Sequence, residues 1–307
     1  MQPIQARQLI DDYDALLLDA YGVLVDKTGP LPGACAFIDR LNALGKPYYL
    51  LTNSASRLPG PMAADLAGIG LSIAADRIIT SGMLLAGWVE RKGLQGCGAV
   101  VLGTSDSQRY AEQAGLRPLC LNDLETQFSA QVDPAAALVI ADQAGFDLLP
   151  VINAVLGMLL RQCDQGRPPG LVLCNPDLIY PRAPGLFGFT AGSLAAMFEA
   201  VLMERYGVDA PGFDRLGKPN PPIFEEAIRR IGGGRVVMVG DQLATDIAGA
   251  NRCGIDSVLV GTGLAGAVDA EEPVQPTWWM SSLLLDEKMH TLRSANKRKS
   301  TNTTRNS

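Results

Sequence analysis

Short apolar stretches of four or five residues alternate with longer segments of helical periodicity along most of this 307-residue chain. Continuous apolar runs of that length are typical of strands buried on both faces. Strands that alternate with helices indicate a parallel sheet covered by helices on both sides. The chain therefore predicts an α/β protein with a doubly wound, Rossmann-like parallel sheet.

The predicted elements form two outer blocks separated by a second series of the same kind. The first block has strands at 15–19, 48–52 and 77–80 and helices at 35–44 and 58–66. The last block has strands at 235–240 and 257–261, a helix at 245–253 and a final edge strand at Trp278-Trp279. The series between them has strands at 99–102, 137–141 and 171–174. We therefore predict a core domain at 1–80 and 187–286, with an α/β cap domain inserted at 81–186.

Charge is distributed unevenly along the chain. Residues 287–307 carry six Lys or Arg and one Glu, a net +5, so residues 1–286 hold 20 basic and 31 acidic residues, a net −11. The tail has little to bury and is predicted to be disordered, and its run Lys297–Lys299 indicates solvation rather than a polyanion-binding arm. The acidic body argues against nucleic-acid binding. No apolar run reaches the roughly 18 residues of a membrane span, so we expect no membrane partner.

The cysteines and the single histidine limit which kinds of catalytic or metal site this chain can form. The six cysteines form no C-x-x-C pair, and the chain's start lacks the pattern of a signal peptide, which together favour reduced thiols in a cytoplasmic protein. His290 lies beside the basic tail. A Ser-His-Asp triad and an imidazole metal site are thereby excluded. The chemistry must rest on carboxylates, hydroxyls, lysine and an oxygen-bound cation.

Polar residues stand where three predicted strands end, and a lysine stands in a loop ahead of the last of these strands. They are Asp19, then Thr52 and Asn53, then Lys218, then Asp241 and Asp246. Ligands of open α/β sheets bind beyond the carboxyl ends of the strands. These residues therefore predict one crevice whose carboxylates suit a divalent cation and whose lysine suits a phosphate.

In order and spacing, these residues resemble the four motifs of the haloacid dehalogenase superfamily of aspartate-based phosphotransferases. The motifs read Asp19–Leu24, Thr52–Ser54, Lys218-Pro219 and Gly240-Asp241 with Asp246. The insert between the second and third motifs resembles the class IIA cap. Near the end of the insert, Asn175-Pro176-Asp177 resembles a sequence feature of that class. This feature makes the chain similar to the branch that contains the N-acetylglucosamine-phosphate and 4-nitrophenyl-phosphate phosphatases. The resemblance covers residues 1–286.

This resemblance implies a Mg²⁺-dependent, phosphatase-like hydrolase of small phosphorylated metabolites. Asp19 is then the nucleophile that forms an aspartyl-phosphate. The implied Mg²⁺ ligands are Asp19, the backbone carbonyl of Tyr21, Asp241 and, through water, Asp246. The implied phosphate-binding groups are the Thr52 hydroxyl, the Asn53 backbone N–H and Lys218, which also offsets negative charge at the nucleophile. We further predict that Asn175 and Asp177 reach the substrate, with an Asx-type turn as the alternative. A homodimer is one alternative for the oligomeric state.

The first motif departs from the superfamily's phosphatases at one position. They have an Asp two residues after the nucleophile, which protonates the leaving oxygen and later activates water, whereas this chain has Tyr21. A phenol with a pKa near 10 is a poor base at neutral pH. Loss of acid–base catalysis typically costs about 10²–10⁴-fold in rate. We therefore predict an enzyme slowed or specialised by Tyr21, with a non-catalytic phosphometabolite-binding protein as the alternative.

A third interpretation rests on Gly261–Gly266, a G-x-G-x-x-G sequence that directly follows a predicted strand. A dinucleotide-binding fold needs a helix to begin in this loop. The residues that follow contain two prolines and no apolar stripe. A glycine loop at the rim of the crevice is therefore favoured over a nicotinamide-dependent oxidoreductase.

Overall fold

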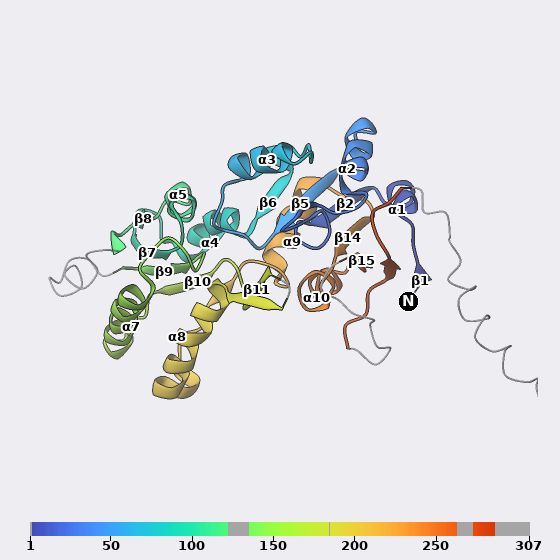
Figure 1. Ribbon diagram of the computed structural model, residues 1–307. Coiled ribbons are helices and arrows are strands. Elements are labelled where there is room, and N and C mark those ends of the chain that lie inside the picture. The colour runs from blue at the N-terminus through green and yellow to red at the C-terminus, as the bar shows by residue number, and fades with distance from the viewer. Residues whose placement is uncertain (1, 122–134, 184, 263–272, 286–307) are drawn as a thin grey trace, which may run out of the picture.

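The strands form two separate parallel sheets in the computed structural model, which describes residues 2–121, 135–183, 185–262 and 273–285 (Figure 1). The basic tail with His290 lies outside the described residues, and so do positions 263–266 of the glycine-rich loop. Nothing in the structure tests what the sequence predicts for those segments.

The larger sheet has seven strands, and every neighbouring pair in it is parallel. In spatial order they are β1 (Gln2–Pro3), β16 (Trp278–Met280), β15 (Asp256–Val260), β14 (Val236–Gly240), β2 (Ala15–Asp19), β5 (Tyr48–Thr52) and β6 (Ile78–Thr80). The central strands β2 and β14 are buried along their whole length. Such burial requires helices on both faces of the sheet.

Helices cover both faces of this sheet, as its apolar strands require (Figure 1). They are α1 (Ala6–Asp12), α2 (Ala34–Ala43) and α3 (Pro59–Gly68) on one face, and α9 (Pro221–Ile231) and α10 (Ala248–Arg252) on the other. Leu16 and Leu18 of β2 join the cluster with α1 and α2, whereas Leu17 joins the cluster with α9. Successive side chains of a strand point to opposite faces, so this alternation confirms the predicted doubly wound sheet.

The strand β16 is not at the edge of the sheet, contrary to the sequence prediction for Trp278-Trp279. The two-residue strand β1 pairs with it in parallel, with Gln2 opposite Trp278 and Pro3 opposite Trp279. A strand this short carries no apolar alternation that a sequence pattern can detect. Its proline suits the outermost position of a sheet, since proline cannot donate to a further strand.

The smaller sheet has five strands, all parallel to their neighbours. In spatial order they are β13 (Asp214–Arg215), β10 (Gly170–Leu173), β9 (Ala137–Ile140), β7 (Gly98–Leu102) and β8 (Arg117–Pro118). Its two faces pack against α7 (Leu148–Asp164) with α8 (Ala191–Tyr206), and against α4 (Leu85–Lys92) with α5 (Ser105–Gln113).

The predicted end of the inserted domain, at residue 186, falls before two elements that belong to the smaller sheet. Helix α8 packs on this sheet, and β13 is one of its strands. A helical sequence pattern by itself does not show which sheet a helix covers. We therefore propose that the inserted domain extends from residue 81 through Arg215.

The remaining elements are short. They are the antiparallel pairs β3 (Val25–Asp26) with β4 (Gly29–Pro30) and β11 (Ile179–Ala183) with β12 (Leu186–Phe189), the 3-10 turns η1 (Ala75–Arg77), η2 (Ser81–Leu84) and η4 (Gly207–Asp209), and the π-helical turn η5 (Leu243–Ile247). The turn η5 and α10 together replace the single helix predicted at 245–253. Asp246 therefore lies in a π-helical turn.

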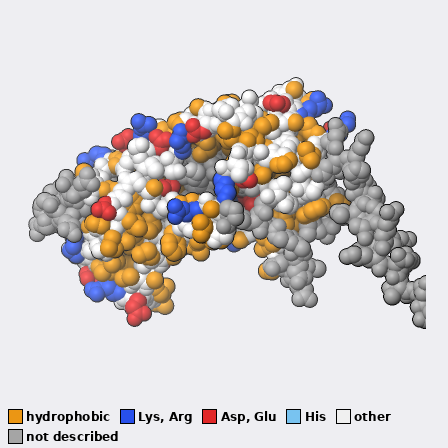
Figure 2. All heavy atoms as spheres, in the orientation of Figure 1, with side chains coloured by type: hydrophobic (Ala, Val, Ile, Leu, Met, Phe, Trp, Pro, Cys, Tyr) orange, Lys and Arg blue, Asp and Glu red, His pale blue; other side chains and the backbone are white. Residues whose placement is uncertain are grey.

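Hydrophobic side chains gather on the surface over α7 and α8 (Figure 2). Leu149, Met197 and Met203 are among the exposed large hydrophobic residues there.

No helix in the described ranges is long and apolar enough to cross a membrane. The homodimer remains a prediction.

Candidate active site

The carboxyl ends of three adjacent strands bring the predicted site residues to one edge of the larger sheet. Strand β2 lies between β14 and β5, and all three are parallel. Asp19 is the last residue of β2, Thr52 is the last of β5, and Asp241 follows β14 directly. The edge that ligands use in such sheets therefore carries the predicted motifs.

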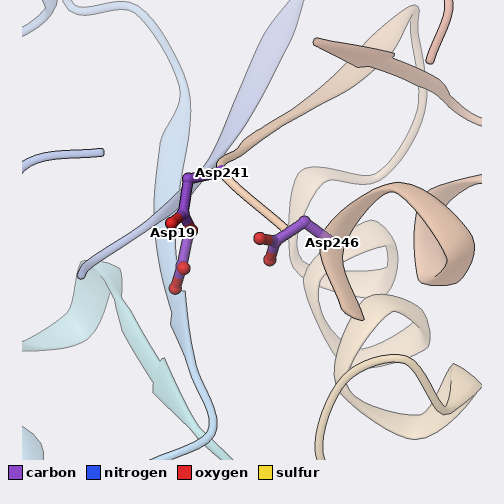
Figure 3. A group of neighbouring side chains, drawn as sticks. All are labelled: Asp19, Asp241 and Asp246. Carbon is purple, nitrogen blue, oxygen red and sulfur yellow. The ribbon is translucent and has the colours of Figure 1, made fainter. Parts of the chain in front are cut away.

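Three carboxylates meet at this edge. Oxygen atoms of Asp19, Asp241 and Asp246 lie within 4.8 Å of one another. Figure 3 shows the side chains of Asp19 and Asp241 close together, with Asp246 directed toward them from the next turn of the chain. All three residues are buried, and the backbone N–H of Gln242 donates to Asp246 Oδ2 at 3.2 Å.

Lys218 joins two of these carboxylates. Its Nζ donates to Asp19 Oδ1 at 2.6 Å and to Asp246 Oδ1 at 2.7 Å, and the residue is only 2% exposed. Burial acts to lower the pKa of Lys218, but the Asp19 and Asp246 carboxylates outweigh it, so that the pKa is raised and the ammonium stays charged. Burial is also the main reason that the pKa of Asp19 is raised; Asp246 and Asp241 act in the same direction, and Lys218 opposes them.

The buried cluster fits a divalent cation. Three carboxylates and one ammonium group give a formal charge of −2 in a site shielded from water. Uncompensated charge is costly to bury. Carboxylate oxygens are the ligands that Mg²⁺ prefers, and such an ion would neutralise this excess.

Two glycines allow the carboxylates to approach. A Cβ atom at Gly22, whose φ is +87°, would lie 2.3 Å from Asp241 Oδ2. A Cβ atom at Gly240 would lie 2.1 Å from the Cβ of Asp246. No side chain is tolerated at such distances. The sequence motifs contain both glycines, but their role depends on these contacts.

The side chain of Asn53 connects three parts of the chain. Its Nδ2 donates to Asp177 Oδ1 at 2.9 Å and to the Lys218 carbonyl at 3.0 Å, and its Oδ1 accepts from the Lys218 backbone N–H at 2.6 Å. A Cβ atom at Gly217 would lie 2.6 Å from that Oδ1. The amide group of Asn53 thus holds Lys218 in place, while phosphate binding by its backbone N–H remains a prediction.

The segment Asn175–Asp177 forms the predicted alternative, an Asx-type turn. Asn175 Oδ1 accepts a hydrogen bond from the Asp177 backbone N–H at 3.0 Å, as in an Asx turn. Burial raises the pKa of the Asp177 carboxyl group, against the effects of Asn53 and Lys218. Both residues also line the cavity described next. A turn and a role at the substrate are therefore compatible.

A cavity of about 430 Å³ opens above the carboxylate cluster and reaches both sheets. Seven predicted residues line it: Asp19, Tyr21, Thr52, Asn53, Asn175, Asp177 and Lys218. Asp241 and Asp246 are not among the lining residues, since both are almost completely inaccessible. Eight further residues complete the lining, and apart from Ser54 none belongs to the predicted motifs: Ser54, Ser56, Asp142, Gln143, Tyr180, Thr190, Gln242 and Thr245. Asp142 and Gln143 closely follow strand β9, so the strand-end rule applied to the inserted series would have found them.

Tyr21 lines the same cavity and is 42% exposed. Partial burial, aided by the Asp26 charge, raises the pKa of its phenol above the usual value, against a hydrogen bond with the Lys27 backbone. The phenol is therefore protonated at neutral pH and cannot act as a general base there.

Comparisons with known proteins agree with this site. A family model described as haloacid dehalogenase-like hydrolase matches residues 16–117, and a second, described as HAD-hydrolase-like, matches residues 215–285. The chain is 32% identical to a solved "possible sugar phosphatase, HAD superfamily" from Cytophaga hutchinsonii, over 93% of this chain and 99% of that one, with a TM-score of 0.79. It is 28% identical to a dihydroxyacetone phosphatase of Corynebacterium glutamicum, over 87% of this chain and 88% of the relative. It is 25% identical to a glycerol phosphate phosphatase of Mycobacterium tuberculosis solved with magnesium, over 90% and 77% of the two chains, with a TM-score of 0.72.

The similarity to these proteins covers the residues of both sheets. The chain belongs to the haloacid dehalogenase superfamily of hydrolases, in its class IIA branch. The resemblance predicted from the four motifs is thereby confirmed.

Proposed function

We propose that this chain is a Mg²⁺-dependent phosphatase of small phosphorylated metabolites that works through an aspartyl-phosphate on Asp19. The observation that carries the proposal is the buried pair of Asp19 and Lys218, with Asp241 and Asp246 beside it, facing a polar cavity. The named phosphatases among its relatives and the magnesium in one of their structures support it.

In the first half of the reaction, an oxygen of the Asp19 carboxylate forms a bond to phosphorus. The bond between phosphorus and the ester oxygen breaks, and its electron pair stays with the leaving oxygen, which takes a proton. In the second half, water attacks the phosphorus of the aspartyl-phosphate, phosphate leaves, and the Asp19 carboxylate is restored. Lys218 Nζ, at 2.6 Å from Asp19, stabilises the negative charge shared by the carboxylate and the phosphoryl group.

Asp19, Asp241, the Tyr21 carbonyl and, through water, Asp246 would hold the cation. Mg²⁺ supplies positive charge that offsets the repulsion between a carboxylate and a phosphate dianion. The Thr52 hydroxyl and the Asn53 backbone N–H would donate to phosphate oxygens. Asn53 is suited to this role because its side chain is already fixed to Lys218.

The rate of the reaction depends on which group gives a proton to the leaving oxygen. The cavity has a protonated phenol where the superfamily's phosphatases have a carboxyl group. A phenol can donate a proton but does not readily take one back from water at neutral pH. This observation favours slow turnover of esters with poor leaving groups, and it keeps a phosphometabolite-binding protein as the second candidate.

Phosphate release from a panel of phosphate esters tests the proposal. With Mg²⁺ we expect release from at least 4-nitrophenyl phosphate, and we expect none in excess chelator. Ca²⁺ should fail to replace Mg²⁺, because it prefers six to eight looser oxygen ligands. Full activity in chelator would contradict the proposal. If no ester is hydrolysed but phosphate esters raise the melting temperature, the binding protein is the correct interpretation.

A further inference from the structure

Four residues of the cavity wall have no role in the steps above. Asp142 and Gln143 follow strand β9 of the smaller sheet, while Ser54 and Ser56 belong to the loop after β5. We infer that this part of the wall binds hydroxyl groups on the carbon skeleton of the substrate, and that Asp142 selects hydroxylated, uncharged leaving groups. The inference rests on the proposed phosphatase function and names its substrate class.

Asp142 is positioned as a fixed hydrogen-bond acceptor. It is 8% exposed, yet it lines the cavity. Its Oδ1 accepts a hydrogen bond from the Ala144 backbone N–H at 2.9 Å. Burial raises the pKa of this carboxyl group, and backbone hydrogen bonds oppose that effect. A carboxylate offers about four acceptor positions, so the bond to Ala144 leaves capacity for a substrate hydroxyl.

The loop that contains Ser56, which also lines the cavity, is held in place by the start of helix α5. The Thr104 hydroxyl donates to the Ser56 carbonyl at 2.7 Å, and the Ser107 hydroxyl donates to the Ala55 carbonyl at 2.8 Å. The Leu58 backbone N–H donates to Asp106 Oδ2 at 3.0 Å. The loop is therefore tied to the inserted domain along its length. A wall fixed in this way needs little reordering when a ligand binds.

The chemistry of the lining favours hydroxyl groups over apolar ones. All fifteen lining residues carry a polar or charged side chain, and the only aromatic rings among them belong to Tyr21 and Tyr180. A site with buried acceptors rejects analogues that lack the matching hydroxyl, because the acceptors then lose their partners. The Asp142 carboxylate also repels a carboxylate on the substrate. We therefore expect neutral polyol or sugar phosphates to be preferred over phosphorylated acids.

The test compares kcat/KM of the full-length wild type and of Asp142→Ala on three kinds of ester. Glycerol 3-phosphate and ribose 5-phosphate carry hydroxyls, 4-nitrophenyl phosphate carries none, and 3-phosphoglycerate adds a carboxylate. For whichever hydroxylated ester the wild type prefers, we expect about a tenfold or greater fall, mainly through KM. For 4-nitrophenyl phosphate the change should stay within about twofold.

Asp142→Asn guards against a folding defect, since it keeps the shape and the acceptor for Ala144. It should raise the kcat/KM ratio of 3-phosphoglycerate to the hydroxylated ester. Asp147→Asn is the matched control, because it removes a charge from an exposed residue of the same loop that does not line the cavity. It should leave all ratios unchanged.

The outcomes separate this inference from the proposed function. Equal losses on every ester, or no change on any, would overturn the role of Asp142. A wild type that hydrolyses 4-nitrophenyl phosphate, but neither hydrolyses the hydroxylated esters nor is inhibited by them competitively, would overturn the inference while leaving the phosphatase proposal intact. A wild type that hydrolyses none of the esters in Mg²⁺ would overturn both.

Discussion

The Nζ atom of Lys218 lies 2.6 Å from Oδ1 of Asp19, although 199 positions separate the two residues in the chain. Asp19 ends a central strand, whereas Lys218 precedes helix α9 and is held by the Asn53 side chain. Because the pair is buried, each partner depends on the other for its charge. Lys218 thereby orients the Asp19 carboxyl group and favours its ionised form against the effect of burial, which raises its pKa.

Asp19→Asn should lower phosphate release by about 10³-fold or more, because an amide oxygen is not a nucleophile for phosphorus at neutral pH. The melting temperature should show whether the fold persists. Asp39→Asn, at an exposed position of α2, is the matched control and should leave turnover unchanged. Normal turnover by Asp19→Asn would rule out the aspartyl-phosphate.

Tyr21→Asp should increase hydrolysis of alkyl phosphates by up to about 10²–10⁴-fold, the usual effect of a positioned acid–base group. Alkoxide leaving groups need a proton, whereas 4-nitrophenolate is stable near neutral pH. Aryl phosphate hydrolysis should therefore change much less than alkyl phosphate hydrolysis. The measurement is kcat for both esters with both proteins. If the wild type hydrolyses an alkyl phosphate rapidly and Tyr21→Asp slows it, the phenol or another group supplies the proton.

Two substitutions of Asn175 should separate its turn from its contact with the substrate. Asn175→Asp keeps an acceptor for the Asp177 N–H but adds negative charge to the cavity, so KM for phosphate esters should rise about tenfold at an unchanged melting temperature. Asn175→Ala removes the acceptor and should cost about 1 kcal/mol of unfolding free energy. Unaltered kinetics in Asn175→Asp would show that the residue serves only the turn.

Gly22→Ala should abolish most of the activity, because its Cβ would collide with Asp241 Oδ2. We expect a much higher Mg²⁺ requirement together with a lower melting temperature. Gly232→Ala is the control: its φ of +80° is close to the +87° of Gly22, but no atom lies within 4 Å of its Cβ. It should show only the cost of the left-handed backbone, about 1–2 kcal/mol. Equal activity losses in both variants would contradict a specific role of Gly22 in placing Asp241.

The fold class, and the edge of the sheet at which the site lies, could be predicted from the amino-acid sequence alone. Apolar runs such as Ala15–Leu18 predict strands buried on both faces, because a residue that is buried in a sheet is usually apolar. Parallel strands place their carboxyl ends together, so polar residues that follow such runs converge without further information. For this reason Asp19, Thr52 and Asp241 could be assigned to one crevice from the sequence.

How distant segments of the chain meet in that crevice could be seen only in the folded protein. The hydrogen bonds of Asn53 to Lys218 and Asp177, and that of Thr104 to the Ser56 carbonyl, join segments that no periodicity relates. In the same way, α8 and β13 belong to the smaller sheet, and β1 covers the edge at β16. A polarity pattern records whether a residue is buried but does not identify its partner. Partners are fixed by packing and backbone geometry across the whole chain.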